Sequence, residues 1–432
     1  MKNGTLTCCW FRFPMIPYAS LRRSTASLKR LAGVRGNITV DPLTNLVGLS
    51  APEKAARGLE FTPAEISQQP RTWIATFDLL LKRRKDLIDF LTNAGIARPT
   101  EQRPTVFLIG AGTSDYIGRS VHHLLQTQWQ CEVIPLASTS LLTDFAESII
   151  RDKRYLWISF SRSGDSPEGV AVLERALAEY PAIAHLLVTC NQAGRMNRAV
   201  HGRDNCFSIV LDNATNDRGL AMTSSFTNMV LTAQFLAHAR SLEVYEPVLR
   251  RLAGAAQGFM PRAAEMAFDL AATGFERACF VGSCSLAGAA LECSLKLLEL
   301  TSGQVQTMTQ PTLALRHGPM AALNGETLFV GLVSSHPQRR RYELDLLREV
   351  GSKGLAKVRV AIATDPDGLA SDAEHVLSPG AAGPIPDLYR PMLDVIFGQL
   401  LGLFASIRCG LKPDAPSPTG AINRVVQNVE IY

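Results

Sequence analysis

The sequence predicts an α/β protein built from two tandem modules, each a parallel sheet with helices on both faces. Short apolar segments alternate with small polar loops and helical stretches, a pattern typical of parallel α/β folds. Part of this pattern recurs after 172 residues, which indicates a duplicated module. The chain has 432 residues, 46% of them hydrophobic, and this length is typical of two domains.

Composition and charge exclude several classes of protein. With 44 Lys and Arg against 39 Asp and Glu, the net charge of +5 is too small to predict a nucleic-acid or membrane surface. The nine cysteines have no CxxC spacing, so we expect no metal site and a reducing cytoplasm. Residues 395–407 form the most apolar late stretch, shorter than the roughly 20 residues of a membrane span. We therefore expect a cytoplasmic protein with no nucleic-acid or membrane partner.

Residues 1–60 are predicted to be an N-terminal extension without folded structure. They carry a basic stretch and no acidic residue before Asp41, which is typical of a targeting peptide. The apolar part is poorly formed and no clean cleavage site follows it, so a disordered extension or an upstream start codon is favoured. From Phe61 the chain becomes regular, and Thr62 with Pro63 reads as a helix start. Residues 61–104 are therefore predicted to form leading helices.

The first module is predicted over residues 105–250. Residues 105–110 read as a strand that passes through a glycine turn into a helix over 116–128. A second strand, 155–160, runs into the small polar loop 161–166 and a helix that begins at Pro167. A third strand is expected over 185–189.

The second module is predicted over residues 251–411, followed by a tail over 412–432. Residues 279–285 match 107–113, and residues 327–335 match 155–163 at the same offset of 172. Residues 358–364 follow at nearly the matching place for the third strand. Apolar strands can resemble one another by chance, but equal offsets on two independent elements favour a true repeat. The hydroxyl-rich loops of the first copy are changed in the second, which suggests that one copy binds and the other supplies chemistry.

The loops that follow the first two strands predict a phosphate site. Ligands of open parallel sheets bind beyond the carboxyl ends of the strands, where helix N-termini direct free N–H groups outward. Gly112 and Gly164 let the backbone approach a ligand closely. Neither a P-loop nor a full dinucleotide motif is present, so a sugar monophosphate is favoured. The simpler alternative is that these serines only cap helices. The hydroxyl groups concerned belong to Ser114, Ser161, Ser163 and Ser166.

A second group of residues could transfer protons. Glu292, Lys296 and Glu299 fall on one face of the helix that follows Gly288. Considered without other residues, these three charges are most simply interpreted as a solvent-exposed stripe of ion pairs. His317 lies nearby, at a glycine-proline turn after a loop predicted over 307–310. A carboxylate, a lysine and a histidine are the set that proton transfer next to a carbonyl uses.

These motifs together resemble tandem sugar isomerase (SIS) domains, as in the isomerase half of glucosamine-6-phosphate synthase. The resemblance covers residues 61–432 and implies two flavodoxin-like domains. Residues 221–227, 315–319 and 417–427 are more closely similar to the tagatose-6-phosphate ketose/aldose isomerase group, also called galactosamine-6-phosphate deaminase/isomerase.

The resemblance also implies roles for individual residues. Glu299 matches the base that moves a proton between C1 and C2, and Lys296 matches the nearby cation. His317 matches the ring-opening histidine, which the partner subunit donates, so a homodimer or higher homo-oligomer is implied. A partly buried glutamate with a raised pKa suits this proton transfer, and a lysine suits a developing enolate. The expected substrate-binding residues are Gly112, Thr113, Ser114, Ser161, Arg162, Ser163, Ser166 and Gln427.

The sequence departs from the synthase pattern in two places. The tail lysine that forms a Schiff base in the synthase falls at about Gln427, so free-imine chemistry fits better than a covalent imine there. The chain begins Met1-Lys2-Asn3, without the synthase's cysteine nucleophile and glutaminase domain, so glutamine-dependent amination is not expected. The family suggests no role for the N-terminal extension.

The sequence therefore predicts a deaminating aldose-ketose isomerase that acts on the hexosamine phosphate galactosamine 6-phosphate. It would yield tagatose 6-phosphate and ammonia, need no metal or organic cofactor, and have its C-terminal tail over the active site. Plain isomerisation without loss of nitrogen uses the same base and stays open. A sugar-phosphate-binding regulator is the alternative from another class, and it is less favoured because Lys296, Glu299 and His317 are retained.

Overall fold

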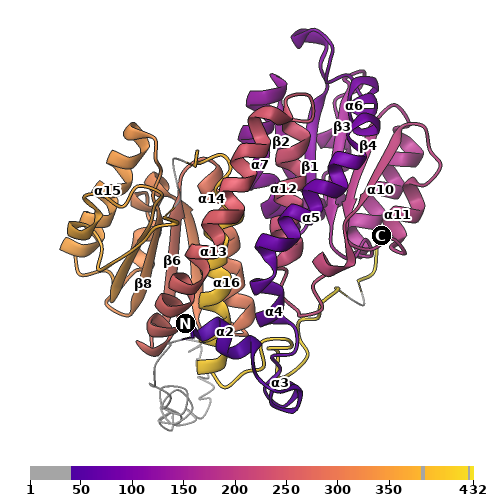
Figure 1. Ribbon diagram of the computed structural model, residues 1–432. Coiled ribbons are helices and arrows are strands. Elements are labelled where there is room, and N and C mark those ends of the chain that lie inside the picture. The colour runs from indigo at the N-terminus through magenta and orange to yellow at the C-terminus, as the bar shows by residue number, and fades with distance from the viewer. Residues whose placement is uncertain (1–39, 381–384, 427–428) are drawn as a thin grey trace, which may run out of the picture. The chain divides into compact units, whose positions relative to one another are not determined.

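The computed structural model describes residues 40–380, 385–426 and 429–432, and in this part of the chain two parallel five-stranded sheets lie within one compact unit (Figure 1). The first sheet has the strand order β2-β1-β3-β4-β5. Its strands are β1 (Thr105–Gly110), β2 (Val133–Ala137), β3 (Tyr155–Ser161), β4 (Ala184–Thr189) and β5 (Cys206–Val210). The second sheet has the order β10-β9-β8-β6-β7. Its strands are β6 (Arg277–Gly282), β7 (Gln306–Pro311), β8 (Thr327–Leu332), β9 (Val358–Ile362) and β10 (His375–Leu377).

The predicted α/β fold with a duplicated module is confirmed. Read from β7 to β10, the second sheet repeats the strand order of the first, and all of the pairings are parallel. Strands β6 and β8 begin 172 residues after β1 and β3, which is the offset of the sequence repeat. The recurrence therefore reflects two copies of one topology rather than chance similarity of apolar segments.

Helices precede, connect and cover the strands. The leading helices are α2 (Pro42–Val47), α3 (Ala51–Arg57), α4 (Thr62–Ser67), α5 (Gln69–Lys82) and α6 (Arg84–Asn93). The helices of the first module are α7 (Thr113–Trp129), α8 (Ser138–Thr143), α9 (Phe145–Ser148), α10 (Pro167–Glu179), α11 (Arg195–Val200) and α12 (Ser224–Ala237). Those after it are α13 (Leu242–Ala272), α14 (Ser285–Leu300), α15 (Pro337–Ser352) and α16 (Pro391–Arg408). Short 3-10 helices are η1 (Thr100–Gln102), η2 (Asn213–Thr215), η3 (Thr312–Arg316), η4 (Pro319–Ala322) and η5 (Leu369–Ser371).

The expectation that residues 1–60 lack folded structure is wrong for the part that the structure describes. The carboxylate of Asp41 accepts hydrogen bonds from the first N–H groups of α2, and Ser50 with Glu53 forms a capping box at α3. Leu43 and Leu46 of α2 are buried in the main core. These cap signals and the buried leucines hold the segment in place. The basic stretch predicted before Asp41 lies outside the described residues.

The sequence missed four strands, and each lies at an edge of its sheet. β2 and β5 are the edges of the first sheet, and β7 and β10 are those of the second. Residues 307–310, predicted as a polar loop, lie in β7. As an edge strand, β7 pairs only with β6, so a polar sequence can form it. The strands that were recognised are inner strands, whose burial on both faces requires continuous apolar sequence.

Five helices join the two modules into one hydrophobic core. Helices α7, α12, α13, α14 and α16 run between the two sheets (Figure 1), and the core cluster draws residues from both modules. A Cβ atom on Gly288 of α14 would lie 2.6 Å from the backbone nitrogen of Ser120 on α7. Cβ atoms added to Gly398 and Gly402 of α16 would likewise lie too close to Cys293 and Lys296 of α14. Helix α14 is therefore packed tightly on two sides.

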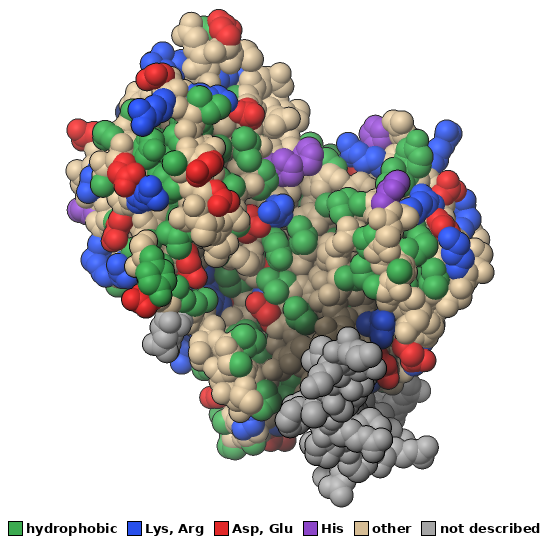
Figure 2. All heavy atoms as spheres, turned by 180° about the vertical axis from the view of Figure 1, so that it is seen from behind, with side chains coloured by type: hydrophobic (Ala, Val, Ile, Leu, Met, Phe, Trp, Pro, Cys, Tyr) green, Lys and Arg blue, Asp and Glu red, His purple; other side chains and the backbone are tan. Residues whose placement is uncertain are grey.

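Helix α16 is long and apolar enough to span a membrane by length and composition, and it is the one such helix among the described residues. Within the structure 89% of it is buried in the core, and a buried core helix passes the same test. It is therefore weak evidence for a membrane span. On the face shown in Figure 2, acidic and basic side chains are interspersed rather than gathered by sign.

Replacing Gly288 by Ala should lower the free energy of unfolding by roughly 1–3 kcal/mol, because the new methyl group would push α14 away from α7. Denaturant unfolding of the purified variant measures the change.

The matched control is Gly254→Ala, also inside a helix, where nothing lies within 4 Å of an added Cβ. This substitution should raise the free energy of unfolding by about 0.5–1 kcal/mol, because alanine loses less backbone entropy in a helix than glycine does. Equal stabilities of the two variants would contradict the tight crossing.

Candidate active site

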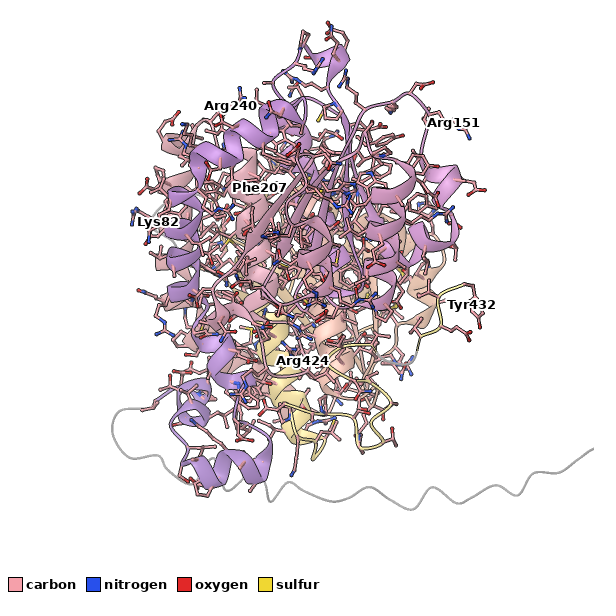
Figure 3. All side chains as sticks on the ribbon, turned by 90° about the vertical axis from the view of Figure 1, so that its right-hand side faces the viewer. Lys82, Arg151, Phe207, Arg240, Arg424 and Tyr432 are labelled. Carbon is pink, nitrogen blue, oxygen red and sulfur yellow. The ribbon has the colours of Figure 1, made fainter. Side chains whose placement is uncertain are left out.

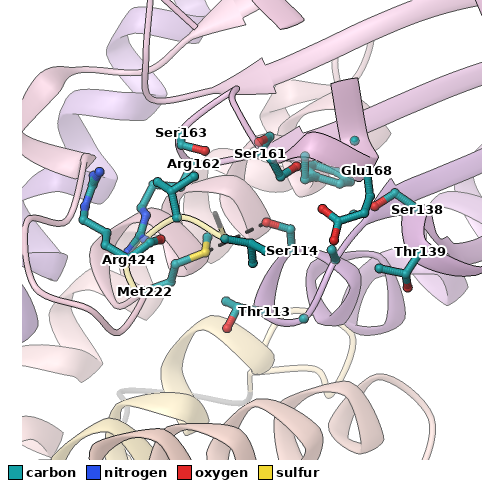
Figure 4. A pocket seen from close by; sticks show the side chains of 18 of the residues that line it. Thr113, Ser114, Ser138, Thr139, Ser161, Arg162, Ser163, Glu168, Met222 and Arg424 are labelled. Atoms are coloured by element: carbon teal, nitrogen blue, oxygen red, sulfur yellow. Dashed lines mark hydrogen bonds between the residues drawn. The ribbon is translucent and has the colours of Figure 1, made fainter. Parts of the chain in front are cut away.

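A cavity of about 510 Å³ lies at the carboxyl ends of β1, β2 and β3 (Figure 4). Its walls come from the loops after these three strands, from α14 of the second module and from the C-terminal tail. We call it the β1–β3 cavity. Residues that line it include Gly112, Thr113, Ser114, Ser138, Thr139, Ser161, Arg162, Ser163, Ser166, Glu168, Lys296, Glu299 and residues 421–426.

All seven described residues that were predicted to surround a sugar phosphate line this cavity. They belong to the N-terminus of α7 and to the loop between β3 and α10. Gly112 is the N-cap of α7 with φ of 55° and ψ of −125°, a conformation that a side chain disfavours. In the first turn of this 17-residue helix the N–H groups of Ser114 and Asp115 donate to the carbonyl oxygens of Ala111 and Gly112, and this end carries the positive dipole of the helix. Backbone and hydroxyl donors therefore converge where an anion would bind.

Neighbouring side chains hold the loop after β3 in shape. The amide of Asn191 donates to the carbonyl of Ser163 at 2.8 Å and to the carboxylate of Asp165 at 3.2 Å. The same carboxylate accepts a hydrogen bond from the backbone N–H of Arg195 at 2.8 Å. Gly164 has φ of 65° and packs against the backbone of Gly194. The hydroxyl-bearing loop is thus fixed by contacts to the next loop, after β4.

The charged face of α14 is buried, so its alternative reading as a solvated stripe is wrong. Lys296 and Glu292 are completely buried, and the side chain of Glu299 is 27% exposed. The Lys296 Nζ lies 2.6 Å from Glu299 Oε2 and 3.4 Å from Glu292 Oε1. It also donates to the hydroxyl of Thr113 at 3.0 Å, which connects α14 to the first module. Lys296 and Glu299 line the cavity, and Glu292 contacts Lys296 from outside the cavity lining.

Burial and charge set the protonation of these groups. Burial raises the pKa of Glu292 to about 8, although Lys296 opposes this shift. Glu292 Oε2 is also buried without a hydrogen-bond partner. Burial acts to lower the pKa of Lys296, but the two carboxylates outweigh it and the pKa is raised. Lys296 therefore stays an ammonium at neutral pH.

Other predicted site residues lie elsewhere or differ in their contacts. His317 follows η3, is exposed and does not line the cavity of its own chain. Gln427 lies outside the described residues. Arg162 lines the cavity, but its guanidinium donates to main-chain carbonyl groups.

Several residues that line the cavity were not predicted. Ser138 and Thr139 were missed because they follow β2, an edge strand that the sequence did not reveal. Glu168 was seen only as part of a helix start, although a carboxylate in the first turn after a serine loop was a usable signal. Among the residues that the structure describes, no group of three or more His, Cys, Asp or Glu side chains could hold a metal ion.

Comparison with known proteins identifies close relatives. No family model matches the chain. The D-galactosamine-6-phosphate deaminase AgaS of Escherichia coli is 35% identical over 384 residues, which cover 88% of this chain and 97% of that protein. The enzyme of the same name from Shewanella sp. (strain ANA-3) is 31% identical over 392 residues, covering 89% and 95% of the two chains. The crystal structure of tagatose-6-phosphate ketose/aldose isomerase from Escherichia coli matches with a TM-score of 0.76 at 32% identity, over 83% of this chain and 97% of that one.

The variant Glu292→Gln should change how stability depends on pH. Glu292 holds its proton up to about pH 8 in the folded chain but only to about 4.5 in the unfolded chain. Between these values the folded state binds more protons, so this group's stabilising contribution falls by up to about 1.4 kcal/mol per pH unit as the pH rises. Glutamine does not titrate and removes this decline.

Thermal or urea unfolding at several pH values between 5 and 8 measures the effect. The stability of the wild-type protein minus that of Glu292→Gln should decrease steadily over this range. Glu265→Gln, an exposed change on α13, serves as the control and should differ from the wild type by the same amount at every pH. A pH-independent difference for Glu292→Gln would mean that Glu292 is ionised throughout.

Proposed function

The chain belongs to the family of D-galactosamine-6-phosphate deaminases AgaS and is an enzyme of the sugar-phosphate isomerase class, and from this premise we propose that it converts galactosamine 6-phosphate to tagatose 6-phosphate and ammonia. The observation that carries the proposal is the placement of Lys296 and Glu299 in the same cavity as the hydroxyl-rich loops. A phosphate on the loops would leave the far end of a six-carbon sugar free to reach an acid-base pair.

In the proposed reaction the loops after β1 and β3 bind the phosphate. The serine hydroxyl groups and the helix N-termini there offer uncharged hydrogen-bond donors to the phosphate. With the sugar ring open, the carboxylate of Glu299 removes the proton from C2. The electron pair moves toward C1 and O1, where the ammonium of Lys296 opposes the developing negative charge.

Return of the proton to C1 then completes the isomerisation. The nitrogen at C2 loses a proton and becomes an imine, O1 gains a proton so that C1 becomes a hydroxymethyl group, and water hydrolyses the imine to the ketone and ammonia. Glu299 is suited to carry the proton because it is the partly exposed member of the cluster, whereas Glu292 is enclosed. Thr113 and Glu292 orient Lys296 through contacts at 3.0 and 3.4 Å.

We also propose that His317 opens the ring in the active site of a partner subunit. His317 lies in the exposed turn between η3 and η4, where Gly318 has φ of 114°, and it does not line the cavity of its own chain. If His317 takes part in the reaction, its exposed position favours the cavity of another copy of the chain. A two-fold dimer would place two such histidines symmetrically.

The variant Glu299→Gln should lose ammonia release from galactosamine 6-phosphate. Removing a general base lowers kcat by roughly 10²–10⁴-fold, while binding through the phosphate loops is retained. Ammonia formed from galactosamine 6-phosphate and, separately, from glucosamine 6-phosphate is measured with purified wild type and variant.

Glu246→Gln, on the exposed side of α13, is the matched control and should keep full activity. Turnover that persists in Glu299→Gln but disappears in Ser163→Ala would overturn the role of the base and keep that of the phosphate loop. If neither amino sugar yields ammonia but tagatose 6-phosphate is isomerised, the reaction is the plain isomerisation.

Mixing two inactive variants tests the donation of His317. His317→Ala and Glu299→Gln should each be inactive alone, but subunit exchange between them should restore about a quarter of the wild-type activity. Half of the randomly formed dimers are mixed, and each contains one intact site built from both chains. If the histidine acted within its own chain, the mixture would stay inactive.

A further inference from the structure

Arg162 is directed at the main chain on one side of the β1–β3 cavity. Its side chain is buried, and its Nη1 atom donates to the carbonyl oxygen of Leu220 at 3.1 Å and more weakly to that of Gly219 at 3.4 Å. Its Nη2 atom donates to the carbonyl oxygen of Arg424 at 2.5 Å. One guanidinium thus joins the loop before α12 to the C-terminal tail.

Arg424 makes the reciprocal connection. Its Nε atom donates to the carbonyl oxygen of Asp217 at 2.7 Å, and its Nη2 atom donates to the side-chain oxygen of Asn216 at 2.6 Å. Both arginines therefore connect the same two segments, residues 216–220 and the tail around residue 424. Figure 4 shows the two side chains next to each other beside the cavity.

The loop side of this connection is fixed. Asp217 is completely buried, and its carboxylate accepts hydrogen bonds from the backbone N–H groups of Thr223, Ser224 and Ser225 at 2.8 to 3.0 Å. Glu65 of α4 accepts from the backbone N–H of Arg218 at 2.5 Å. Residues 216–220 are therefore part of the rigid frame to which the tail is attached.

The tail side carries few other attachments. Residues 421–423 and 426 are exposed, whereas Arg424 and its neighbour Val425 are half-buried. All six residues from 421 to 426 line the cavity. In Figure 3 Arg424 lies against the body of the protein and Tyr432 lies at its outer edge. Displacement of this segment would remove one wall of the cavity.

We propose, on the premise that this cavity is the substrate site, that Arg162 and Arg424 are positioning residues that hold residues 421–426 as a cavity wall. Arg162 then acts on substrate through the tail and is not a direct ligand of the phosphate. Both of its terminal nitrogens already donate to main-chain carbonyl groups, and a phosphate oxygen bound to them would compete with these bonds; its Nε atom is buried without a hydrogen-bond partner. In this proposal the hydroxyl and N–H donors of the loops bind the phosphate.

A double-mutant cycle between the two arginines tests this proposal. The four proteins are the wild type, Arg162→Met, Arg424→Met and the double variant, and Arg250→Met on the exposed face of α13 is the control. Three quantities are measured: the rate at which proteinase K cleaves within residues 421–426, the affinity for inorganic phosphate by calorimetry, and KM and kcat for ammonia release.

Each single variant should speed cleavage of the tail roughly tenfold, because each removes hydrogen bonds of a charged group. KM should rise in both, and the double variant should exceed neither single variant by much, because either loss frees the same segment. The affinity for inorganic phosphate should stay within about threefold of the wild type, because the loop donors remain. Arg424→Lys, which can replace one of the two hydrogen bonds, should recover part of the KM. Arg250→Met should match the wild type throughout.

Two results would overturn the proposal. One is a loss of phosphate affinity of tenfold or more in Arg162→Met alone with unchanged tail cleavage, which would make Arg162 a phosphate ligand. The other is additive effects of the two substitutions on KM. If Arg162→Met does not fold, the test rests on Arg424→Met alone. Unchanged cleavage of the tail in that variant would contradict the proposal that the arginines hold residues 421–426 as a cavity wall. Cleavage and phosphate binding do not depend on which reaction occurs, so a failure of the proposed function would leave this test intact.

Discussion

The buried ammonium of Lys296 is the constraint on which the rest of the site depends. A charge removed from water is tolerated only when partners compensate it, and here the carboxylate of Glu299, the carboxyl group of Glu292 and the hydroxyl of Thr113 do so. Thr113 belongs to the first module and Lys296 to the second, so one of the three contacts of the ammonium exists only while α7 and α14 stay packed. The contact of Gly288 with Ser120 holds these two helices together. The packing of the two modules therefore also brings Lys296 beside the loop after β1.

The two copies of the module have diverged at equivalent positions. In the second copy, the N–H of Ser334 donates to the carboxylate of Glu343 at 2.6 Å, and the N–H of Ser335 donates to that of Asp387 at 3.0 Å. Asp387 is in turn paired with Arg390, which is fully buried. Side chains of the chain itself thus occupy the donors that remain open in the first copy. Helix α14 of the second copy instead supplies Lys296 and Glu299 to the cavity at the strand ends of the first copy.

The sequence predicted the elements whose burial on both faces requires an apolar sequence. It missed the features that depend on contacts with distant parts of the chain. Inner strands such as β1 and β8 read clearly because every residue in them is buried, whereas the edge strand β7 is polar and half-exposed. The spacing of Glu292, Lys296 and Glu299 gave their common face, but not their burial, because the covering helices are distant in sequence. The hydroxyl loops could be found from local signals. The partners of Arg162, about 60 and 260 residues away, could not.

The state of Lys296 also limits how a deamination could proceed. A lysine can attack a carbonyl carbon only as a neutral amine with a free lone pair. Here Glu292 and Glu299 raise the pKa of Lys296 and three side chains contact its Nζ, so the group remains an ammonium. Gln427, near which the resemblance to the synthase would place a Schiff-base lysine, has no nucleophilic amine. The nitrogen at C2 would then leave by hydrolysis of a free imine rather than by exchange with an enzyme lysine. A cavity that must admit one water molecule at that step, yet shield the enolate before it, gives a reason for a wall that is attached by hydrogen bonds rather than built into the core.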